Sequence, residues 1–537
     1  MNDNGKIYFA KKGPEERPDE KIYLNPSMAN RHGFIGGATG TGKSVTLKVL
    51  AESFSDMGVP TFFSDVKGDM AGIAVPGEDN EGMQKRLDRF DIRDQFQYRG
   101  FPVTIYDIYG EKGIPLRTTV SEMGPQLMAQ ILDLNDTQSD LLAVSYKIAD
   151  DQQMLLIDTK DLKSMLTYIS ENAADFEMEY GHITKTSMAT IIRSIVALEA
   201  EGADRFFGEP AINITDFFTL GPDGRGMVNI LDAETLISKP KLYSAFMLYL
   251  LSELFEILPE VGDLEKPKMV FFFDEAHLLF NNASKALLEK IQQVVKLIRS
   301  KGIGLFFITQ SPGDIPSAVM AQLGNKIEHG LHAYTPAEQK VVKAAADSFR
   351  ENPDFDTEDV LKNLGTGEAV VSTLDENGAP SVAEYAYILP PESSMRAISD
   401  ETRDRLVKES LLYTKYGTMV DPDSAYEILA RMKAQVTEAQ EQAAALAAQQ
   451  KQEEKEAKEQ AKAEEKAQKE AEKEAAKKEK EVNKIKTNVA KTTGSSVGRE
   501  VGKIVGEAVL GKKGRTIFGN IGSTIGRNIM GTLTKNK

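Results

Sequence analysis

Eight residues near the start of the chain have the types and spacing of a phosphate-binding loop. The run GATGTGKS, Gly37–Ser44, follows a short apolar stretch and opens a segment with helical character. Glycines permit the tight turn whose backbone N–H groups surround phosphate oxygens, and the helix N-terminus adds a partial positive charge. Lys43 is expected to reach the outer phosphates of a nucleoside triphosphate, and the Ser44 hydroxyl to bind Mg²⁺. The loop therefore predicts nucleotide binding.

A pair of acids supplies the second half of such a site. Asp274 and Glu275 come directly after the apolar run 269–273, MVFFF. We expect Asp274 to hold the Mg²⁺ shell and Glu275 to polarise the water that attacks the terminal phosphate. An acidic pair after a strand is more often a helix N-cap, so it is the phosphate-binding loop that favours catalysis here. For His277 two roles stay open, coupling to the water or phosphate and local packing at a helix start.

Two further polar residues end apolar runs. Gln310 follows the run 304–309, where its side chain can hydrogen-bond the attacking water or the terminal phosphate; a simple turn residue is the alternative. Asp65 ends another strand-like run and opens the sequence DVKGD. Because α/β sheets bind ligands at the carboxyl ends of their strands, we expect Asp65 near the nucleotide or a subunit interface. A turn-stabilising aspartate is the alternative for Asp65.

Together these patterns predict a site for a nucleoside triphosphate and Mg²⁺. The residues expected to contact the nucleotide are Gly37, Ala38, Thr39, Gly40, Thr41, Gly42, Lys43, Ser44, Thr46 and Asp65, with Ser44 and Asp274 as magnesium ligands.

The elements that must position this site alternate along the chain. Short β-type runs and longer helical patterns follow one another up to about residue 390, which indicates an α/β domain with a mostly parallel sheet. Between about 107 and 222 the strand signals fade and amphipathic helices are expected instead. The expected strands are 33–36, 60–64, 103–106, 227–231, 269–273, 303–309 and 368–373. The expected helices are 121–134, 137–149, 162–172, 187–200 and a buried one at 242–255.

We expect the chain to divide into five parts. We expect 1–106 and 223–400 to form the two parts of the nucleotide-binding core, with 107–222 as a mainly helical insertion. Residues 401–483 read as a helical extension that becomes rich in Ala, Glu, Lys and Gln. Ile428, Met432 and Val436 can share one stripe of it, but residues 450–481 contain no Leu, Ile or Val. That part therefore fits a solvated single helix better than a coiled coil.

The last part, 484–537, carries glycine at every fourth position from Gly494 to Gly506, with valines between them. Small residues at this spacing leave a flat helix face. Three roles stay open for it: a helix-packing element for oligomerisation, an amphipathic segment at a membrane surface, and an unstructured basic tail.

Charge and composition exclude several classes of protein. Residues 484–537 hold 11 Lys and Arg against two Glu, a net of +9, so the chain's net charge of −16 leaves −25 on residues 1–483. A body this acidic argues against a protein that coats DNA with a generally basic surface. With no cysteine among 537 residues, disulfides, a catalytic thiol and iron–sulfur clusters are ruled out. The polar N-terminus and the lack of a long apolar stretch predict a cytoplasmic protein.

The signature HGFIGGATGTGKS, 32–44, resembles that of the HerA–FtsK superfamily of ring-forming P-loop motor ATPases. The run DVKGD, the sequence DEAH at 274–277 and Gln310 support this resemblance. More narrowly, the chain from about 5 to 430 resembles the bacterial HerA-helicase-like family. The segments that carry this resemblance are PLRTTVSEMGP at 115–125, FFGEP at 206–210, LFEILPEVGD at 254–263, LIRSKGIG at 297–304, LGNKIEH at 323–329 and PPE at 390–392.

The resemblance implies a RecA-like P-loop core and a hexameric ring, in which an arginine from the neighbouring subunit completes each ATP site. Such a cation neutralises charge that develops on the phosphoryl oxygens. Arg299 is our candidate for it, although a cation at a helix C-terminus also stabilises the helix dipole. The family tends to have arginines where this chain has Lys326 and His332, and lysine lacks the planar bidentate contact.

The resemblance also bears on partners. HerA proteins carry a sizeable β-barrel before the motor, which docks a nuclease. Only about 30 residues precede the phosphate-binding loop here, so we expect no nuclease partner of that kind.

Three functions are compatible with these patterns. The first is a DNA translocase or helicase-like motor, for which the candidate pore loops at 107–120 and 311–320 are not notably basic. The second is an ATP-driven machine that remodels proteins or acts at a membrane surface through the tail. The third is a scaffold that hydrolyses ATP slowly and assembles with it.

Overall fold

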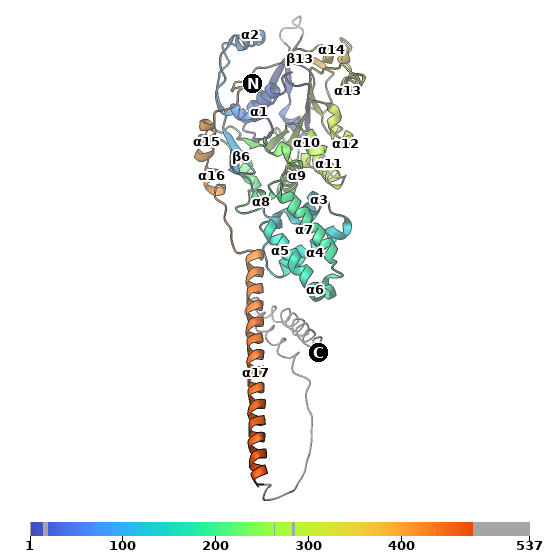
Figure 1. Cartoon of the computed structure of the whole chain (residues 1–537). Coiled ribbons are helices and arrows are strands. Elements are labelled where there is room, and N and C mark those ends of the chain that lie inside the picture. The colour runs from blue at the N-terminus through green and yellow to red at the C-terminus, as the bar shows by residue number, and fades with distance from the viewer. Residues whose placement is uncertain (1, 14–19, 263, 282–284, 476–537) are drawn as a thin grey trace. The chain divides into compact units, whose positions relative to one another are not determined.

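The computed structural model describes residues 2–13, 20–262, 264–281 and 285–475, and the glycine-patterned tail 484–537 lies outside them (Figure 1). The chain forms two compact units. The first comprises Met1–Leu142, Ile157–Thr159 and Thr190–Pro422, and the second comprises Ala143–Leu156, Lys160–Ala189 and Asp423–Lys537.

A single sheet of 13 strands organises the first unit. Eight strands are parallel and stand in the order β11-β4-β10-β9-β5-β8-β6-β7. Their bounds are β4 Gly33–Gly36, β5 Thr61–Asp65, β6 Val103–Asp107, β7 Ile114–Pro115, β8 Val228–Asp232, β9 Met269–Phe273, β10 Ile303–Ile308 and β11 Asn325–His329. Strands β9 and β10 are buried along their whole length, as expected for parallel strands covered on both faces. The predicted α/β fold with a mostly parallel sheet is confirmed.

Five antiparallel strands extend this sheet beyond β11. They are β1 Asn2–Asp3, β2 Lys6–Lys12, β3 Lys21–Leu24, β12 Glu368–Ser372 and β13 Glu384–Ile388. Of these, only β12 is among the strands that the sequence predicts. Strand β2 pairs with β13, so the residues before the phosphate-binding loop complete the same sheet that carries the loop. The mixed polar and apolar composition of β2 and β13 explains why their sequences give a weak strand signal.

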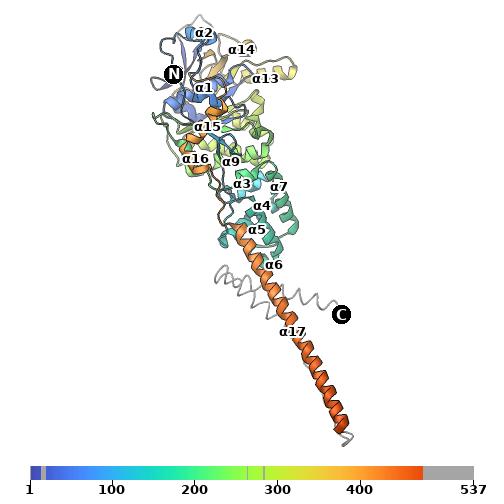
Figure 2. The same cartoon turned by 60° about the vertical axis from the view of Figure 1, so that its left-hand side comes forward.

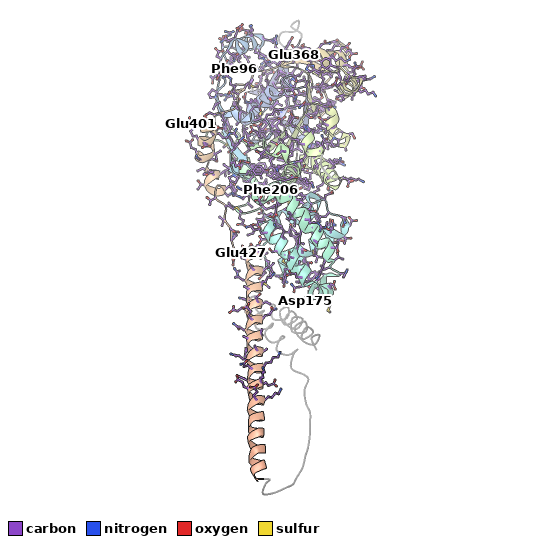
Figure 3. The ribbon with its side chains drawn as sticks, viewed as in Figure 1. Phe96, Asp175, Phe206, Glu368, Glu401 and Glu427 are labelled. Atoms are coloured by element: carbon purple, nitrogen blue, oxygen red, sulfur yellow. The ribbon has the colours of Figure 1, made fainter. Side chains whose placement is uncertain are left out.

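Helices cover the sheet of the first unit (Figure 1). Helix α9 is apolar and buried over most of its length, which confirms the buried helix expected at 242–255. On its flank, Phe206 (labelled in Figure 3) packs against the rings of Phe207, Phe246 and Tyr249. The helices of this unit are α1 Lys43–Asp56, α2 Glu81–Phe90, α3 Val120–Ile131, α8 Ala203–Phe206, α9 Pro240–Ile257, α10 His277–Phe280, α11 Lys285–Ile298, α12 Ser317–Met320, α13 Pro336–Asp347, α14 Thr357–Asn363, α15 Asp400–Glu409 and α16 Leu411–Tyr416.

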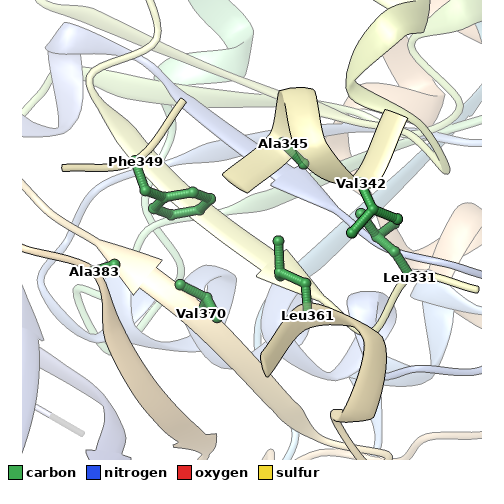
Figure 4. Packing of buried hydrophobic residues seen from close by; sticks show 7 residues of the cluster. All are labelled: Leu331, Val342, Ala345, Phe349, Leu361, Val370 and Ala383. Atoms are coloured by element: carbon green, nitrogen blue, oxygen red, sulfur yellow. The ribbon is translucent and has the colours of Figure 1, made fainter. Parts of the chain in front are cut away.

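A small apolar cluster fixes helices α13 and α14 beside the antiparallel strands. Val342 and Ala345 of α13 and Leu361 of α14 pack on Val370 of β12 (Figure 4). The other members are Leu331, Phe349 and Ala383. Leu331 lies two residues after β11, next to Gly330, whose carbonyl accepts the Ala38 N–H, so this packing also anchors a segment that contacts the phosphate-binding loop.

The second unit is helical. It contains most of α4 Asp136–Asp151, all but the first residue of α5 Thr159–Glu171, α6 Ala173–Tyr180, the start of α7 Lys185–Glu199, and α17 Ala425–Ala475. These helices, with α3, confirm the amphipathic helices predicted between 107 and 222. Asp161 of α5 accepts hydrogen bonds from Ser424 Oγ at 2.6 Å and from the Tyr426 N–H at 2.8 Å, which ties α5 to the start of α17.

Helix α17 is one helix of 51 residues (Figure 2). Its first turns bury Leu429 and Met432, close to the predicted stripe of Ile428, Met432 and Val436. Further along, side chains become exposed, Leu446 at 58%. The described part of this Ala-, Glu-, Lys- and Gln-rich segment, Ala425–Ala475, is therefore one long helix, and its side chains from 441 to 459 are almost all exposed. In the described part of the chain, no helix has the length and apolar character needed to cross a bilayer.

Candidate nucleotide site

Four strand ends bring the predicted site residues to one edge of the sheet. The phosphate-binding loop follows β4, Asp274 and Glu275 follow β9, Gln310 follows β10, and Asp65 ends β5. Because these parallel strands stand in the order β4-β10-β9-β5, β10 lies between the loop strand and the acidic strand. Gln310 therefore stands at the end of the strand between the loop and the acids.

The loop depends on glycines with left-handed backbone angles. Gly37, Gly40 and Gly42 have φ values of +140°, +81° and +124°. A Cβ atom on Gly37 would lie 2.5 Å from the Cβ of His329, so the backbone passes too close to β11 for any side chain. The Ala38 N–H donates to the Gly330 carbonyl at 3.0 Å, which joins the loop to the segment after β11.

Lys43 belongs to the loop and is also the first residue of α1. Its ammonium donates to the carbonyl oxygens of Gly37, at 2.5 Å, and Ala38, at 3.0 Å, and the residue is buried. Burial, together with the nearby Lys67, lowers the pKa of Lys43. The ammonium is thus held by backbone oxygens in the centre of the turn, next to Ser44 at the first turn of α1.

Thr46 is fully buried behind the loop. Its Oγ1 lies 2.9 Å from His329 Nε2, and His329 Nδ1 lies 2.8 Å from the Glu368 carbonyl oxygen. Burial lowers the pKa of His329 to about 4, so the ring is neutral at pH 7. The carbonyl must accept from Nδ1–H, and Nε2 therefore accepts the Thr46 hydroxyl proton. A nucleotide contact of Thr46 stays a prediction. The contacts of His329 with α1 and β12 were not predicted from the sequence.

Asp274 and Glu275 are both buried at the end of β9. The Glu275 N–H donates to Asp274 Oδ1 at 3.0 Å, and Glu275 has a left-handed φ of +48°. The Ala276 N–H donates to the Ile308 carbonyl at 2.8 Å, which fastens this turn to the end of β10. The turn that carries the two acids is therefore fixed next to the end of β10, which Gln310 follows.

Three polar side chains surround the Glu275 carboxylate. Gln310 Nε2 donates to Oε1 at 3.3 Å, Lys67 Nζ lies 3.0 Å from Oε1, and His277 Nδ1 lies 3.3 Å from Oε2. Burial opposes the ionisation of Glu275, but Lys67, Gln310 and His277 outweigh it, so the pKa of Glu275 is lowered. Glu275 is therefore a carboxylate at neutral pH, which a general base must be.

The contacts of Asp65 are those of a turn-stabilising aspartate. Its carboxylate accepts the N–H groups of Lys67 at 3.2 Å, Gly68 at 2.8 Å and Met70 at 2.9 Å. Burial raises the pKa of Asp65 to about 7. A direct contact between Asp65 and the nucleotide stays a prediction, whereas its effect on the position of Lys67 is visible in these hydrogen bonds.

Arg299 is not brought to this edge. It is exposed and opens the short 3₁₀ turn η5, Arg299–Lys301, directly before β10. Since Gln310 follows the other end of β10, Arg299 lies at the opposite edge of the sheet from the site of its own chain. A role for it in catalysis thus requires a neighbouring subunit, as the prediction stated.

Lys48 and Glu52 of helix α1 form a polar clamp that holds the segment after β13, and the sequence analysis did not predict it. The fully buried Glu52 accepts the backbone N–H groups of Glu392, at 2.9 Å, and Ser393, at 3.0 Å, and Lys48 Nζ donates to the Ser394 carbonyl at 2.6 Å. Burial raises the pKa of Glu52 to about 7. A charged pair at i and i+4 in an apolar helix was the available signal. The clamp ties the segment after β13 to the helix that opens at Lys43.

Glu328 is a buried acid beside the loop. It pairs in register with Gly36 across β11 and β4, and its Oε1 has no hydrogen-bond donor among the described residues. Burial raises the pKa of Glu328 to about 8, although Lys43 and Lys326 act in the opposite direction. Unfolding restores the ordinary value of 4.5. Between these two values the folded chain holds a proton that the unfolded chain releases, so stability falls as pH rises through this window.

We expect Glu328→Gln to remove this loss of stability, because a neutral amide binds no proton. Its thermal midpoint should exceed that of the parent by more at pH 8 than at pH 5. Thermal unfolding at pH 5, 6.5 and 8 at constant ionic strength measures the difference. Glu376→Gln, whose side chain is 74% exposed, is the matched control and should leave the pH profile unchanged. Parallel profiles for parent and Glu328→Gln would contradict the assignment.

The residues at this edge fit a nucleotide with Mg²⁺. Ser44 and Asp274 offer the hard oxygen ligands that Mg²⁺ takes in proteins, and the loop provides the N–H groups and the ammonium for phosphates. In the ranges that the structure describes, no group of three or more His, Cys, Asp and Glu is arranged to hold a metal ion.

Comparison with known proteins identifies a matching family and curated relatives. The family model described as helicase HerA-like C-terminal matches residues 10–535. The DNA double-strand break repair helicase HerA of Sulfolobus acidocaldarius is 22% identical over 361 residues, 65% of this chain and 63% of the relative. Its counterpart from Sulfurisphaera tokodaii is 23% identical over 372 residues, 66% of this chain and 64% of the relative. The chain thus spans less than two thirds of the length of these curated relatives.

Two solved structures are similar in fold alone. The plasmid coupling protein TrwB, in complex with a non-hydrolysable ATP analogue, is 16% identical, covers 72% of this chain and 94% of its own, and has a TM-score of 0.45. VirB4 of Thermoanaerobacter pseudethanolicus is 16% identical, covers 73% of this chain and 98% of its own, and has a TM-score of 0.42. Because the family model spans nearly all of its residues, the chain belongs to the helicase HerA-like C-terminal family.

Proposed function

We propose that this chain is a Mg²⁺-dependent ATPase. The observation that carries the proposal is the meeting of three features at one sheet edge: the phosphate-binding loop after β4, the acids after β9, and Gln310 at the end of the strand between them. This arrangement provides separate groups for phosphate binding, for metal binding and for activation of water. Hydrolysis of the bond between the last two phosphates is the reaction that uses all of them.

Each group has one task in this reaction. The loop N–H groups and Lys43 bind the phosphates, and Ser44 with Asp274 would hold Mg²⁺. When bound, Mg²⁺ neutralises charge on the phosphate oxygens. Glu275 accepts the proton of the attacking water, and Gln310, 3.3 Å from its Oε1, orients that water. Glu275 suits this task because its lowered pKa keeps it ionised at neutral pH.

Lys43→Ala is expected to weaken ATP binding by roughly 100-fold or more, because a charge-assisted contact to the phosphates is lost. Titration with a fluorescent ATP analogue measures the affinity. Lys85→Ala is a suitable control, since Lys85 is 73% exposed and pairs with Glu81 one helical turn away. If Lys43→Ala bound the ATP analogue as tightly as the parent, the assignment of the loop to the nucleotide site would be contradicted.

The chain's place in the HerA-like family supports a specific kind of ATPase, a ring-forming motor that acts as a DNA translocase or helicase. The relatives named above are helicases of DNA double-strand break repair. In a ring, each ATP is expected to lie between subunits, most simply in a hexamer. An acidic body that meets DNA inside a central channel is compatible with the charge of −25 on residues 1–483, which comes from the total of −16 and the tail's +9.

The test is the steady-state Mg²⁺-dependent ATPase activity with and without double-stranded and single-stranded DNA, measured across a salt series. DNA should stimulate the ATPase activity of a motor that binds DNA phosphates. This stimulation should decrease as the salt concentration rises, because each phosphate contact releases counterions from the DNA. ATPase activity that is indifferent to DNA at every salt concentration would contradict the DNA motor and leave the ATPase proposal standing.

A second candidate function is remodelling of proteins, or action at a membrane surface, without DNA. The observation that favours it is the separation of charge between the acidic body and the basic, glycine-patterned tail 484–537. Basic segments of this kind bind anionic lipid surfaces. Flotation with anionic liposomes, for the full chain and for a chain ending at 483, distinguishes the candidates. Liposome binding that depends on the tail would support this function. If neither chain bound liposomes, action at a membrane surface would be excluded.

A further inference from the structure

Lys67 has no task in the proposed reaction, yet it contacts both acids of the site. Its Nζ lies 3.2 Å from Asp274 Oδ2 and 3.0 Å from Glu275 Oε1. The Lys67 side chain is 38% exposed, whereas the side chains of the two acids are 7% exposed. A cation that reaches from the surface therefore lies between two buried carboxylates.

The fold fixes the backbone of Lys67 and leaves its side chain long enough to move. Strand β5 pairs with β9 in register, with Ser64 opposite Phe273, so the turns that follow the two strands are neighbours. Asp65 accepts three N–H groups of its own turn, including that of Lys67. The turn is thereby held in place, while the four-carbon stem of Lys67 has freedom that its backbone lacks.

The other nearby lysine cannot replace Lys67. Lys43 donates to the carbonyl oxygens of Gly37 and Ala38, so its ammonium is directed into the loop. Burial raises the pKa of Asp274, and Lys67 is the main influence that opposes this rise. Among the described side chains, Lys67 is the one cation with a contact to both Asp274 and Glu275 at salt-bridge distance.

We propose that Lys67 is a positioning residue that competes with Mg²⁺ for Asp274. The Lys67 ammonium and Mg²⁺ both bind the Asp274 carboxylate. Because the two positive charges repel each other, each weakens the binding of the other to Asp274. The metal then binds well only when the phosphates of the nucleotide arrive with it, since they add negative charge and offer Lys67 another partner. Lys67 thus makes metal binding depend on nucleotide.

This inference rests on the proposed role of Asp274 as a metal ligand. It also differs from a purely structural salt bridge, which would affect the stability of the chain but not its affinity for metal. A measurement of metal affinity without nucleotide separates the two, and it requires no hydrolysis.

The test uses the full chain and Mn²⁺ as the probe, with free Mn²⁺ followed by its paramagnetic resonance signal in the absence of nucleotide. Lys67→Met, which removes the charge and keeps the length of the side chain, should bind Mn²⁺ about tenfold or more tightly than the parent, and Mg²⁺ should displace it. The matched control is Lys85→Met. Lys85 is 73% exposed and pairs with Glu81 within helix α2, so its variant should bind Mn²⁺ as the parent does.

Two further variants complete the test. Asp274→Asn combined with Lys67→Met should lose the gain, which places the metal at Asp274. Lys67→Arg keeps the charge and forms a firmer, forked contact with carboxylates, so it should bind Mn²⁺ more weakly than the parent. This last variant keeps the proposal testable if Lys67→Met does not fold.

Equal Mn²⁺ affinity in parent, Lys67→Met and Lys67→Arg would overturn the proposal, and so would a gain that survives Asp274→Asn. An inactive but folded parent whose Lys67→Met variant still gains metal affinity would overturn the ATPase function and leave the competition intact. The two failures are therefore distinguishable.

Discussion

Glu275→Gln is expected to bind ATP as tightly as the parent and to hydrolyse it roughly 10²–10⁴ times more slowly. The amide has nearly the size of the carboxylate, so the turn after β9 and its place beside Gln310 can persist. It cannot accept a proton from water, however, and the step assigned to Glu275 fails. Steady-state phosphate release gives the rate, and titration with a fluorescent ATP analogue gives the affinity.

The control for this change is Glu81→Gln, an exposed acid at the first turn of α2 that pairs with Lys85. It should retain the parental rate and affinity. If Glu275→Gln hydrolysed ATP at the parental rate, Glu275 would not be the base. If it lost ATP binding as well, the role of Glu275 would lie in building the site.

Arg299→Ala is expected to lower ATP hydrolysis by roughly 10³–10⁵-fold, if its guanidinium neutralises charge on the phosphoryl group of the neighbouring subunit. The residue lies at the opposite sheet edge from its own site, so only a neighbour can use it. Mixing Arg299→Ala subunits with Lys43→Ala subunits tests this geometry. Interfaces that pair an intact Lys43 with an intact Arg299 should regain activity, although each variant alone is inactive.

The matched control is Lys301→Ala, which removes the other cation of η5. It should retain parental activity and should not be needed for complementation. Mixed assemblies that contain both variants and recover no activity would exclude Arg299 as the residue acting across the interface. In that case the remaining role of Arg299 would be to stabilise η5 and the end of helix α11.

Much of the site could be predicted because its signals are local. The loop Gly37–Ser44 carries its own conformational requirement, since left-handed glycines recur where the backbone must turn tightly. Strand ends were also predictable, because runs of buried apolar residues such as 269–273 stop where polar residues begin. The acids Asp274 and Glu275 and the amide of Gln310 were therefore placed correctly at strand ends.

Contacts between distant residues were not predictable in this way. Lys67 stood in a recognised run, DVKGD, but its partners follow another strand, 207 residues away for Asp274. His329 reaches Thr46 across 283 residues, and Glu52 holds Glu392 across 340. Each of these contacts depends on which strands and segments become neighbours, and strands with similar apolar composition give no preference for one order over another.

By itself, then, the sequence determined the kinds of element, the glycine-rich loop Gly37–Ser44, and the acids and amide that follow its strands, because each depends on residues within a few positions of one another. The tertiary structure alone decided that β10 stands between β4 and β9, that β2 pairs with β13, and that Lys67 lies between two carboxylates. The physical reason is that packing and pairing across the whole sheet select one strand order. That order brings together side chains that are far apart in the sequence, and the residues around each of them do not indicate the contact.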